Sequence, residues 1–339
     1  WTTQTSYISQ PNRRTTVPLA TYYQDPRMQY YVKSGEQVDK CGAPYSGIYW
    51  NLLFYDDSLA EDPPSSNPTA MYFSGPGLVS MRSDWSNDAA FAVFVAGDTP
   101  LLGRRYEDGN SFIMGRKGHI FPHAGARIRF NTDNNAMHWY HIHSLSKNTF
   151  KVFDPLERFD INVTNGSVLP LHTGTAMVPS DNMGGQLFAK PLSTTDNYFN
   201  GEGSGGASRD NCSAFPAGIC NYADVIRYEH RPDLGYTYTT GDATAAYTKK
   251  MDFFEREFLF LRPDVFVIFD RVQNVDPSFR TVWTTHSVDN PAVSLTPAET
   301  GPGKRVYQSA QTLTLSGSRN ITYVDALLPQ ANRTVIRGG

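Results

Sequence analysis

An excess of positive charge is absent from this sequence. Its 339 residues include 30 Lys and Arg against 33 Asp and Glu, a formal net charge of −3. Binding to a nucleic-acid backbone needs a basic surface, so we expect no nucleic-acid partner. Long apolar runs are also absent, since the best candidate, 258–269, is interrupted by Arg262, Pro263 and Asp264. We therefore expect no membrane span.

Cysteine is scarce, with three in the chain. Cys212 and Cys220 enclose a short loop in which Pro216 and Gly218 allow the tight reversal that a disulfide would need. The sequence predicts this disulfide, with two buried thiols as the alternative. Cys41 is left over.

Features at the start of the chain and along its length bear on location. The chain begins at Trp1 with no Met and no basic-then-apolar leader, so we expect a processed or partial chain. N-x-Ser/Thr sequons favour an extracellular, glycosylated protein. They lie at Asn162, Asn165, Asn211, Asn320 and Asn332.

The first 70 residues differ in pattern from the rest. Asp25 is a good N-cap before Pro26, and 27–33 followed by Gly35 predicts a short helix. A polar, proline-rich stretch at 61–68 is typical of a connector. We therefore predict a helical and linker segment at 1–70 and a second domain at 71–339.

From residue 71 onward, short runs rich in β-branched and aromatic residues are separated by Gly, Asn, Asp and Pro, which predicts strands. Without long helices, these strands predict an all-β fold, a large antiparallel β-sandwich. A hairpin at 258–270, turning at 262–264 and apolar on both faces, is expected at its centre. The expected strands are 78–82, 91–96, 111–114, 126–130, 137–143, 149–153, 186–189, 223–229, 253–261, 265–272, 281–286, 311–315 and 321–328.

A string of motifs carries a family resemblance. In order along the chain, the segments 81–94, 108–118, 147–154, 184–186, 256–271 and 282–286 resemble the sandwich domain of heparinase II/III-type polysaccharide lyases. The similarity spans about residues 20 to 339. It implies a heparinase II/III-like sandwich, normally preceded by an α/α toroid, of which the helix at 26–33 would be a remnant.

The resemblance also implies a chemistry. Family members cleave uronate-containing glycans by β-elimination, with most of the machinery in the toroid and histidines contributed by the sandwich. Here Arg104, Tyr106 and Lys147 stand where those histidines are expected. A guanidinium stays protonated and cannot act as a base, so Arg104 cannot replace a catalytic histidine.

Two interpretations remain for the segment that holds Arg104, Arg105 and Tyr106. The arginines could neutralise a substrate carboxylate while the tyrosine donates a proton, or the segment could be a solvated basic loop. The acidic pairs at 56–57 and 107–108 fit turns better than a glycosidase site.

Histidines suggest a metal site. His141 and His143 would share one face of a strand, and by the resemblance His123 stands about where the family has an acidic metal ligand. These three predict a structural zinc or other divalent metal, with ordinary hydrogen-bonded histidines as the alternative.

Two classes of function follow. One is an extracellular, non-catalytic sandwich that binds acidic or neutral polysaccharide or assembles with copies of itself into a homo-oligomer or filament. The other is the sandwich part of a polysaccharide lyase. The replaced histidines favour the first, and whether the chain is an enzyme stays open, because a shared fold does not establish activity.

Overall fold

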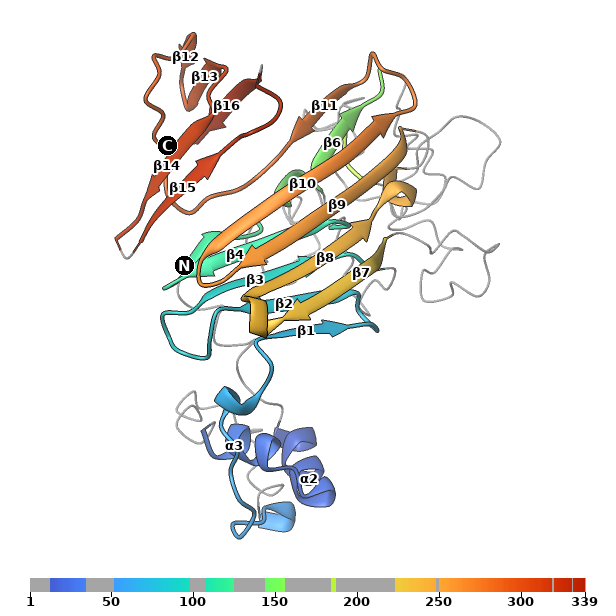
Figure 1. The fold of residues 1–339 in the computed structure, drawn as a ribbon, viewed down its shortest axis with the longest axis vertical. Helices are drawn as coiled ribbons and strands as arrows, with labels where there is room; N and C mark the ends of the chain where they lie inside the picture. The colour runs from blue at the N-terminus through green and yellow to red at the C-terminus, as the bar shows by residue number, and fades with distance from the viewer. Residues whose placement is uncertain are drawn as a thin grey trace, which may run out of the picture. The chain divides into compact units, whose positions relative to one another are not determined.

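The fold is taken from a computed structural model that describes residues 13–34, 52–97, 108–124, 144–155, 184–186, 223–247, 250–318, 320–330 and 332–338. Contacts divide the chain into two units, 1–68 and 69–339, which are described separately. Figure 1 shows the helices and strands. None of the helices in the described ranges is both long and apolar enough to cross a membrane.

Two short helices make up most of the described part of the first unit. They are α2 (Arg13–Tyr23) and α3 (Pro26–Ser34). Asp25 caps α3, because its carboxylate accepts hydrogen bonds from the backbone nitrogens of Arg27 (2.9 Å) and Met28 (3.2 Å). The predicted helix and its N-cap are confirmed, whereas α2 was not predicted.

The helices pack through small and β-branched side chains. Val17 and Ala20 of α2 and Val32 of α3 form a small buried cluster. Gln29 is also buried and donates a hydrogen bond to the carbonyl of Asp56 (2.6 Å), which ties α3 to the following segment. A 3₁₀ turn, Pro64–Ser66, ends the unit in the proline-rich connector.

The second unit contains a five-stranded antiparallel sheet in the order β1-β2-β3-β4-β5. Burial alternates along β2 and β3, as period-two strands with one covered face require. The strands are β1 (Ala70–Phe73), β2 (Leu78–Arg82), β3 (Ala90–Val95), β4 (Ser111–Arg116) and β5 (His119–Phe121).

A four-stranded antiparallel sheet, ordered β10-β9-β8-β7, faces the first. Figure 1 shows it in front of the five-stranded sheet. Its strands are β7 (Asp224–Arg231), β8 (Tyr236–Asp242), β9 (Met251–Leu261) and β10 (Val265–Asn274).

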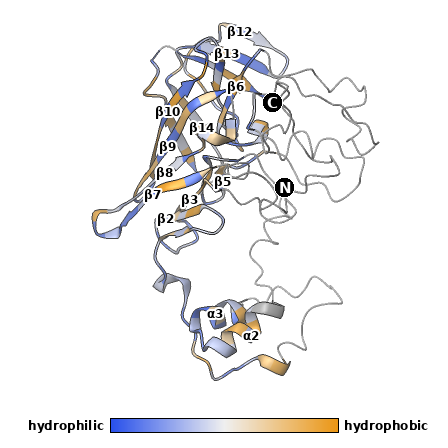
Figure 2. Ribbon diagram, turned by 90° about the vertical axis from the view of Figure 1, so that its right-hand side faces the viewer, coloured by the Kyte–Doolittle hydropathy of each residue, from blue (hydrophilic) through white to orange (hydrophobic). Residues whose placement is uncertain are grey.

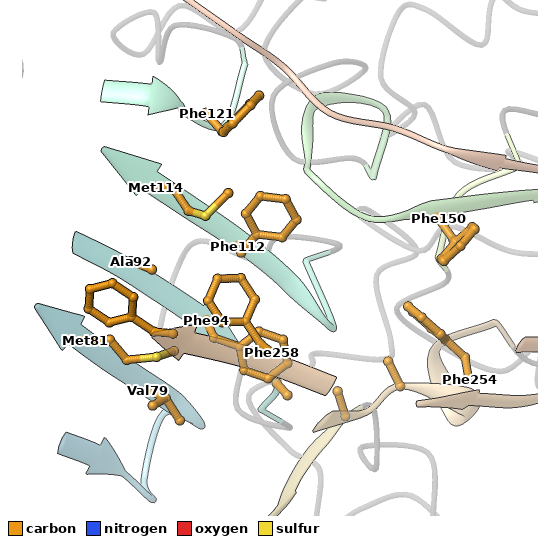
Figure 3. Packing of buried hydrophobic residues seen from close by; sticks show 14 of the residues in the cluster. Val79, Met81, Ala92, Phe94, Phe112, Met114, Phe121, Phe150, Phe254 and Phe258 are labelled. Carbon is orange, nitrogen blue, oxygen red and sulfur yellow. The ribbon is translucent and has the colours of Figure 1, made fainter. Parts of the chain in front are cut away.

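Aromatic rings fill the space between the two sheets. Phe258 of β9 lies against Phe94 of β3 and Phe112 of β4, with ring centroids 5.8 Å and 5.7 Å apart (Figure 3). Buried Val79, Met81, Phe254 and Phe260 extend the same core. The predicted all-β, antiparallel sandwich with a short helical N-terminal segment is confirmed.

The described residues of this unit also form three smaller antiparallel sheets and 3₁₀ turns at Ser144–Ser146, Pro232–Leu234 and Thr244–Tyr247. β6 (Phe150–Phe153) pairs with β11 (Arg280–Trp283), and β14 (Thr312–Ser316) pairs with β15 (Ile321–Asp325). The third sheet contains β12 (Glu299–Gly301), β13 (Lys304–Gln308) and β16 (Arg333–Arg337).

The hairpin of β9 and β10 forms as predicted, turning at 262–264 with Val265 paired to Leu261. Its expected place at the sandwich centre is confirmed for β9, whose Phe254, Phe258 and Phe260 are fully buried, and is wrong for β10. In the described sheet β10 is a terminal strand, and its outward Val265 and Phe269 are 51% and 46% exposed. Figure 2 shows hydrophobic and hydrophilic residues following one another along β9 and β10. Apolar residues on both faces of the hairpin predict that both faces are covered. In the structure only the inner face packs against the other sheet.

Some expected strands cannot be compared. The expected strands at 126–130 and 137–143, and all of 186–189 except Gln186, lie outside the described residues.

Candidate functional site: a buried arginine joining the family motifs

Arg256 lies at the centre of the segments on which the family resemblance rests. Burial alternates along β9, so Arg256 points into the sandwich between Phe254 and Phe258 and is fully buried. The register places Asp270 of β10 directly opposite. The guanidinium donates to both carboxylate oxygens, from Nε to Oδ1 at 2.6 Å and from Nη2 to Oδ2 at 2.9 Å.

The remaining donor group of Arg256 reaches across the sandwich. Nη1 donates to the carbonyls of Asn110 (2.6 Å) and Asn148 (2.9 Å). Trp283 Nε1 donates to Asp270 Oδ2 at 3.1 Å. Four aromatic rings surround the guanidinium at 5.5–5.9 Å, those of Phe112, Phe150, Phe254 and Trp283. A buried charge is tolerated when it is paired and hydrogen-bonded, and Arg256 meets both conditions.

Asn110 stands at the start of β4 in a left-handed conformation, with φ of 53°. Asn tolerates this region better than most residues. Its side-chain amide donates to the carbonyl of Gly241 at 2.9 Å. A Cβ on Gly241 would lie 2.1 Å from Asn110 Oδ1, so the contact needs a glycine there.

Asn148 precedes β6 and bridges three segments. Its amide nitrogen donates to the carbonyls of Phe112 (2.8 Å) and Phe121 (3.3 Å). Its amide oxygen accepts from the backbone nitrogen of His286 (2.7 Å) and from Thr285 Oγ1 (3.3 Å). Asn148 therefore fixes β6 to both β4 and the segment after β11.

Gln186 makes the equivalent link for the Gly-Gly-Gln motif. Its side chain accepts from Gly109 N (2.9 Å) and donates to Gly109 O (2.7 Å). It also donates to Tyr247 Oη (3.2 Å), which in turn donates to the carbonyl of Phe150 (2.6 Å). Nearby, buried Lys250 donates to Gly185 O at 2.5 Å.

These contacts assemble residues that are far apart in the chain, with 146 positions separating Arg256 from Asn110. Most of them belong to the segments on which the family resemblance rests, and the exceptions are Phe121, Gly241, Tyr247, Lys250 and Phe254. All three guanidinium nitrogens of Arg256 donate hydrogen bonds, so its role is to hold the sheets and loops together.

Basic side chains lie next to this cluster. His286 donates from Nε2 to Leu145 O at 2.9 Å. Burial lowers the pKa of His286, and the positive charges of Lys151 and Lys147 act in the same direction, against the effect of the Leu145 hydrogen bond. Lys147, at one of the positions where the family has histidine, is 1% exposed. The surroundings of His286 thus favour its neutral form.

The predicted site residues are only partly within the described structure. His123 is half-buried, with Nε2 3.2 Å from Ser111 Oγ. No group of three or more metal-ligating side chains occurs among the residues the structure describes. Arg104, Arg105, Tyr106, His141, His143, Cys212, Cys220, Asn162, Asn165 and Asn211 lie outside them.

Two sequons are described. Asn320 is half-buried, and its amide donates to Arg116 O at 2.8 Å. Asn332 precedes β16 and donates to Pro329 O at 3.3 Å. Because its hydrogen bond is the longer one and solvent-exposed, Asn332 is the better placed of the two for a glycan.

The Arg256–Asp270 pair was not identified as a site from the sequence. A signal was available, because an arginine inside an apolar strand and an aspartate on the adjoining strand at a matching distance from the turn suggest a cross-strand ion pair. The contacts of Asn110, Asn148 and Gln186 depend on packing between segments that are far apart in the sequence. No local sequence pattern indicates them.

No family model matches the chain, and no curated protein matches it. Among solved structures, heparan sulfate lyase HepC from Pedobacter heparinus aligns over 90% of this chain and 34% of its own, at 13% identity and a TM-score of 0.48. The heparinase III BT4657 gene product aligns over 99% and 40%, at 12% identity and a TM-score of 0.48.

A further heparinase III structure aligns over 100% of this chain and 44% of its own, at 8% identity and a TM-score of 0.48. This chain therefore spans less than half of the length of each of these three proteins. With TM-scores below 0.5, the family resemblance continues to rest on the motifs.

Proposed function

We propose that this chain is a heparinase II/III-like sandwich that binds acidic polysaccharide without cleaving it. The observation that carries the proposal is the Arg256 cluster, in which Asn110, Asn148, Gln186 and Asp270 are used as scaffold. The residues of the motifs that resemble the family thus have structural roles in the fold. Their presence does not imply that the chain is catalytic.

The replaced histidines support a binding role. Lys147 is buried near His286, and lysine is not among the side chains that usually bind zinc in proteins. Arg104 and Tyr106 stand at the other family positions, and an arginine there attracts a carboxylate but cannot remove a proton. The proposal includes an extracellular location. The predicted 212–220 disulfide and the glycosylation sequons support that location.

The test is incubation of the chain with uronate-containing polysaccharides. We expect retardation in affinity electrophoresis but no unsaturated product absorbing in the near ultraviolet. Tyr106→Phe should leave both results unchanged. Product formation that is lost in Tyr106→Phe would instead establish the alternative, the sandwich part of a polysaccharide lyase.

Self-assembly is the second candidate, favoured by the outer face of the β9–β10 hairpin. Its apolar side chains are 39–51% exposed: Leu261, Val265, Val267 and Phe269. Arg271 on the same face forms ion pairs with Glu257 and Glu255 of this chain, so the face carries little net charge to keep copies apart. A homo-oligomer formed through this face is the expected assembly.

A further inference from the structure

The small sheet of β6 and β11 presents a basic face. Lys151 is paired with Val282, and Phe153 with Arg280. Directly opposed residues of antiparallel strands share a face, as do residues two apart on one strand. These four side chains therefore lie together, while Phe150 and Val152 point into the core.

A third cation, from a different sheet, adds positive charge to the surroundings of Lys151. The charges of Arg280 and of Arg337, at the end of β16, both act on Lys151. Burial and then these two positive charges lower the pKa of Lys151 to about 8. Lys151 is thus repelled by both arginines, and Arg280 shares its face of the small sheet.

Acidic partners are missing from this cluster within the described ranges. Lys151, Arg280 and Arg337 form no ion pair with any acid there. Glu299, on the sheet of Arg337, is engaged by Lys304 (3.2 Å) and Arg333 (3.3 Å). The repulsion within the cluster is therefore not balanced by a carboxylate from those parts of the chain.

One member of the cluster is held in place by an aromatic ring. The guanidinium carbon of Arg280 lies 3.9 Å from the centroid of the Phe153 ring. Stacking on a ring orients a guanidinium and leaves its N–H donors free to form a fork for an oxyanion. Arg280 and Arg337 are exposed, so a ligand can approach from solvent.

We propose that Lys151 and Arg280 form an oxyanion site that binds a sulfate or carboxylate group of an acidic polysaccharide. The site rests on the proposed polysaccharide-binding function and specifies where one anionic group is held. A bound oxyanion would neutralise the repulsion between these two cations and accept charge-assisted hydrogen bonds from them, and the positive charge of Arg337 would favour its approach.

The first experiment uses inorganic sulfate and thermal unfolding of the whole chain, in sulfate and in chloride at equal ionic strength. Sulfate should raise the midpoint of the wild-type chain, because a ligand that binds only the folded state stabilises it. Lys151→Met should weaken apparent sulfate affinity by at least about tenfold, and Arg280→Gln should act in the same direction. In chloride, Lys151→Met should unfold at a higher temperature than wild type.

The matched control is Lys117→Met, which removes an exposed lysine paired with Asp88 at 3.2 Å. It should keep the full sulfate response. An equal sulfate response in wild type, Lys151→Met and Arg280→Gln would overturn the site.

A second arm uses heparin in affinity electrophoresis with the same variants. Weaker retardation of Lys151→Met and Arg280→Gln than of Lys117→Met supports the full proposal. Equal retardation of all variants overturns the site while leaving polysaccharide binding intact. If sulfate stabilises the chain through Lys151 but heparin does not retard it, the oxyanion site is supported. The proposal that its ligand belongs to a polysaccharide is then overturned.

Discussion

Arg256 and Asp270 lie directly opposite one another on β9 and β10 and form a two-point ion pair whose arginine is fully buried. The same guanidinium bonds the carbonyls of Asn110 and Asn148, which flank β4 and β6. One side chain therefore connects the hairpin with segments more than 100 residues earlier in the chain. The pair has a structural function that follows from its position between the layers.

Removing this arginine should strongly destabilise the sandwich. Arg256→Met leaves Asp270, whose side chain is 11% exposed, without its cation and two backbone carbonyls without their donor. Breaking a buried ion pair by removing one partner costs about 3–5 kcal/mol. Urea unfolding followed by intrinsic fluorescence should show a loss of this size in the free energy of unfolding.

The control for this prediction is on the same hairpin. Arg271→Met removes an arginine that is 51% exposed and pairs with Glu257 on the outer face. Exposed ion pairs contribute about 0–1 kcal/mol. Equal losses in the two variants would contradict the role assigned to Arg256.

Local pattern was sufficient for much of the fold. The expected strand 78–82 coincides with β2, and the Arg-Pro-Asp turn marked the β9–β10 hairpin correctly. The alternating Tyr and Thr of β8 are also typical of a strand. β10 as a terminal strand was not predictable, because its apolar outer residues look the same in sequence whether or not another layer covers them.

Packing around Asn110 gives a second prediction. Gly241→Ala would place a Cβ 2.1 Å from Asn110 Oδ1 and 2.8 Å from both Ala96 Cβ and the Phe94 ring. Overpacking of a core typically costs about 1–3 kcal/mol. Gly301→Ala is the matched control, since nothing lies within 4 Å of its Cβ and its φ is not positive. Thermal unfolding should show a clear loss for the first variant only.

The candidate site was less accessible from the sequence than the fold. Motif comparison selected the right segments, but it gave no indication that Gln186 bonds Gly109 or that Asn148 bonds the backbone of His286. Those contacts depend on how two sheets and several loops meet. Lys151 looked like an ordinary strand lysine, and its position beside Arg280 and Arg337 appears only in the folded chain.

The exposed face of the hairpin gives a third prediction, on assembly. Val267→Asp places a charge in the apolar face of β10, and burying it in an interface would be costly. Sedimentation velocity should show a homo-oligomer for wild type and a shift toward monomer for this variant. Val288→Asp, at a residue that is 62% exposed in another segment, should behave as wild type. A wild-type chain that stays monomeric at high concentration would contradict self-assembly through this face.

The last prediction concerns pH and follows from the lowered pKa of Lys151. Its usual value of 10.5 applies to the unfolded chain, and the folded value is about 8 because of burial and of the charges of Arg280 and Arg337. Below about pH 8 both states are protonated and the folded state carries the full electrostatic penalty. Between about pH 8 and 10.5 the unfolded state binds more protons, so this group makes stability rise with pH.

Comparison with Lys151→Met isolates this effect, because the tyrosines and other lysines titrate in both chains. In chloride buffer near pH 7 the variant should be the more stable. By about pH 10 the difference in free energy of unfolding between Lys151→Met and wild type should shrink by on the order of 3 kcal/mol. That free energy corresponds to lowering the pKa from 10.5 to about 8. Urea unfolding of both chains at several pH values measures the difference. A difference that does not change with pH would show that Lys151 titrates normally and that the two arginines do not repel it in the folded chain.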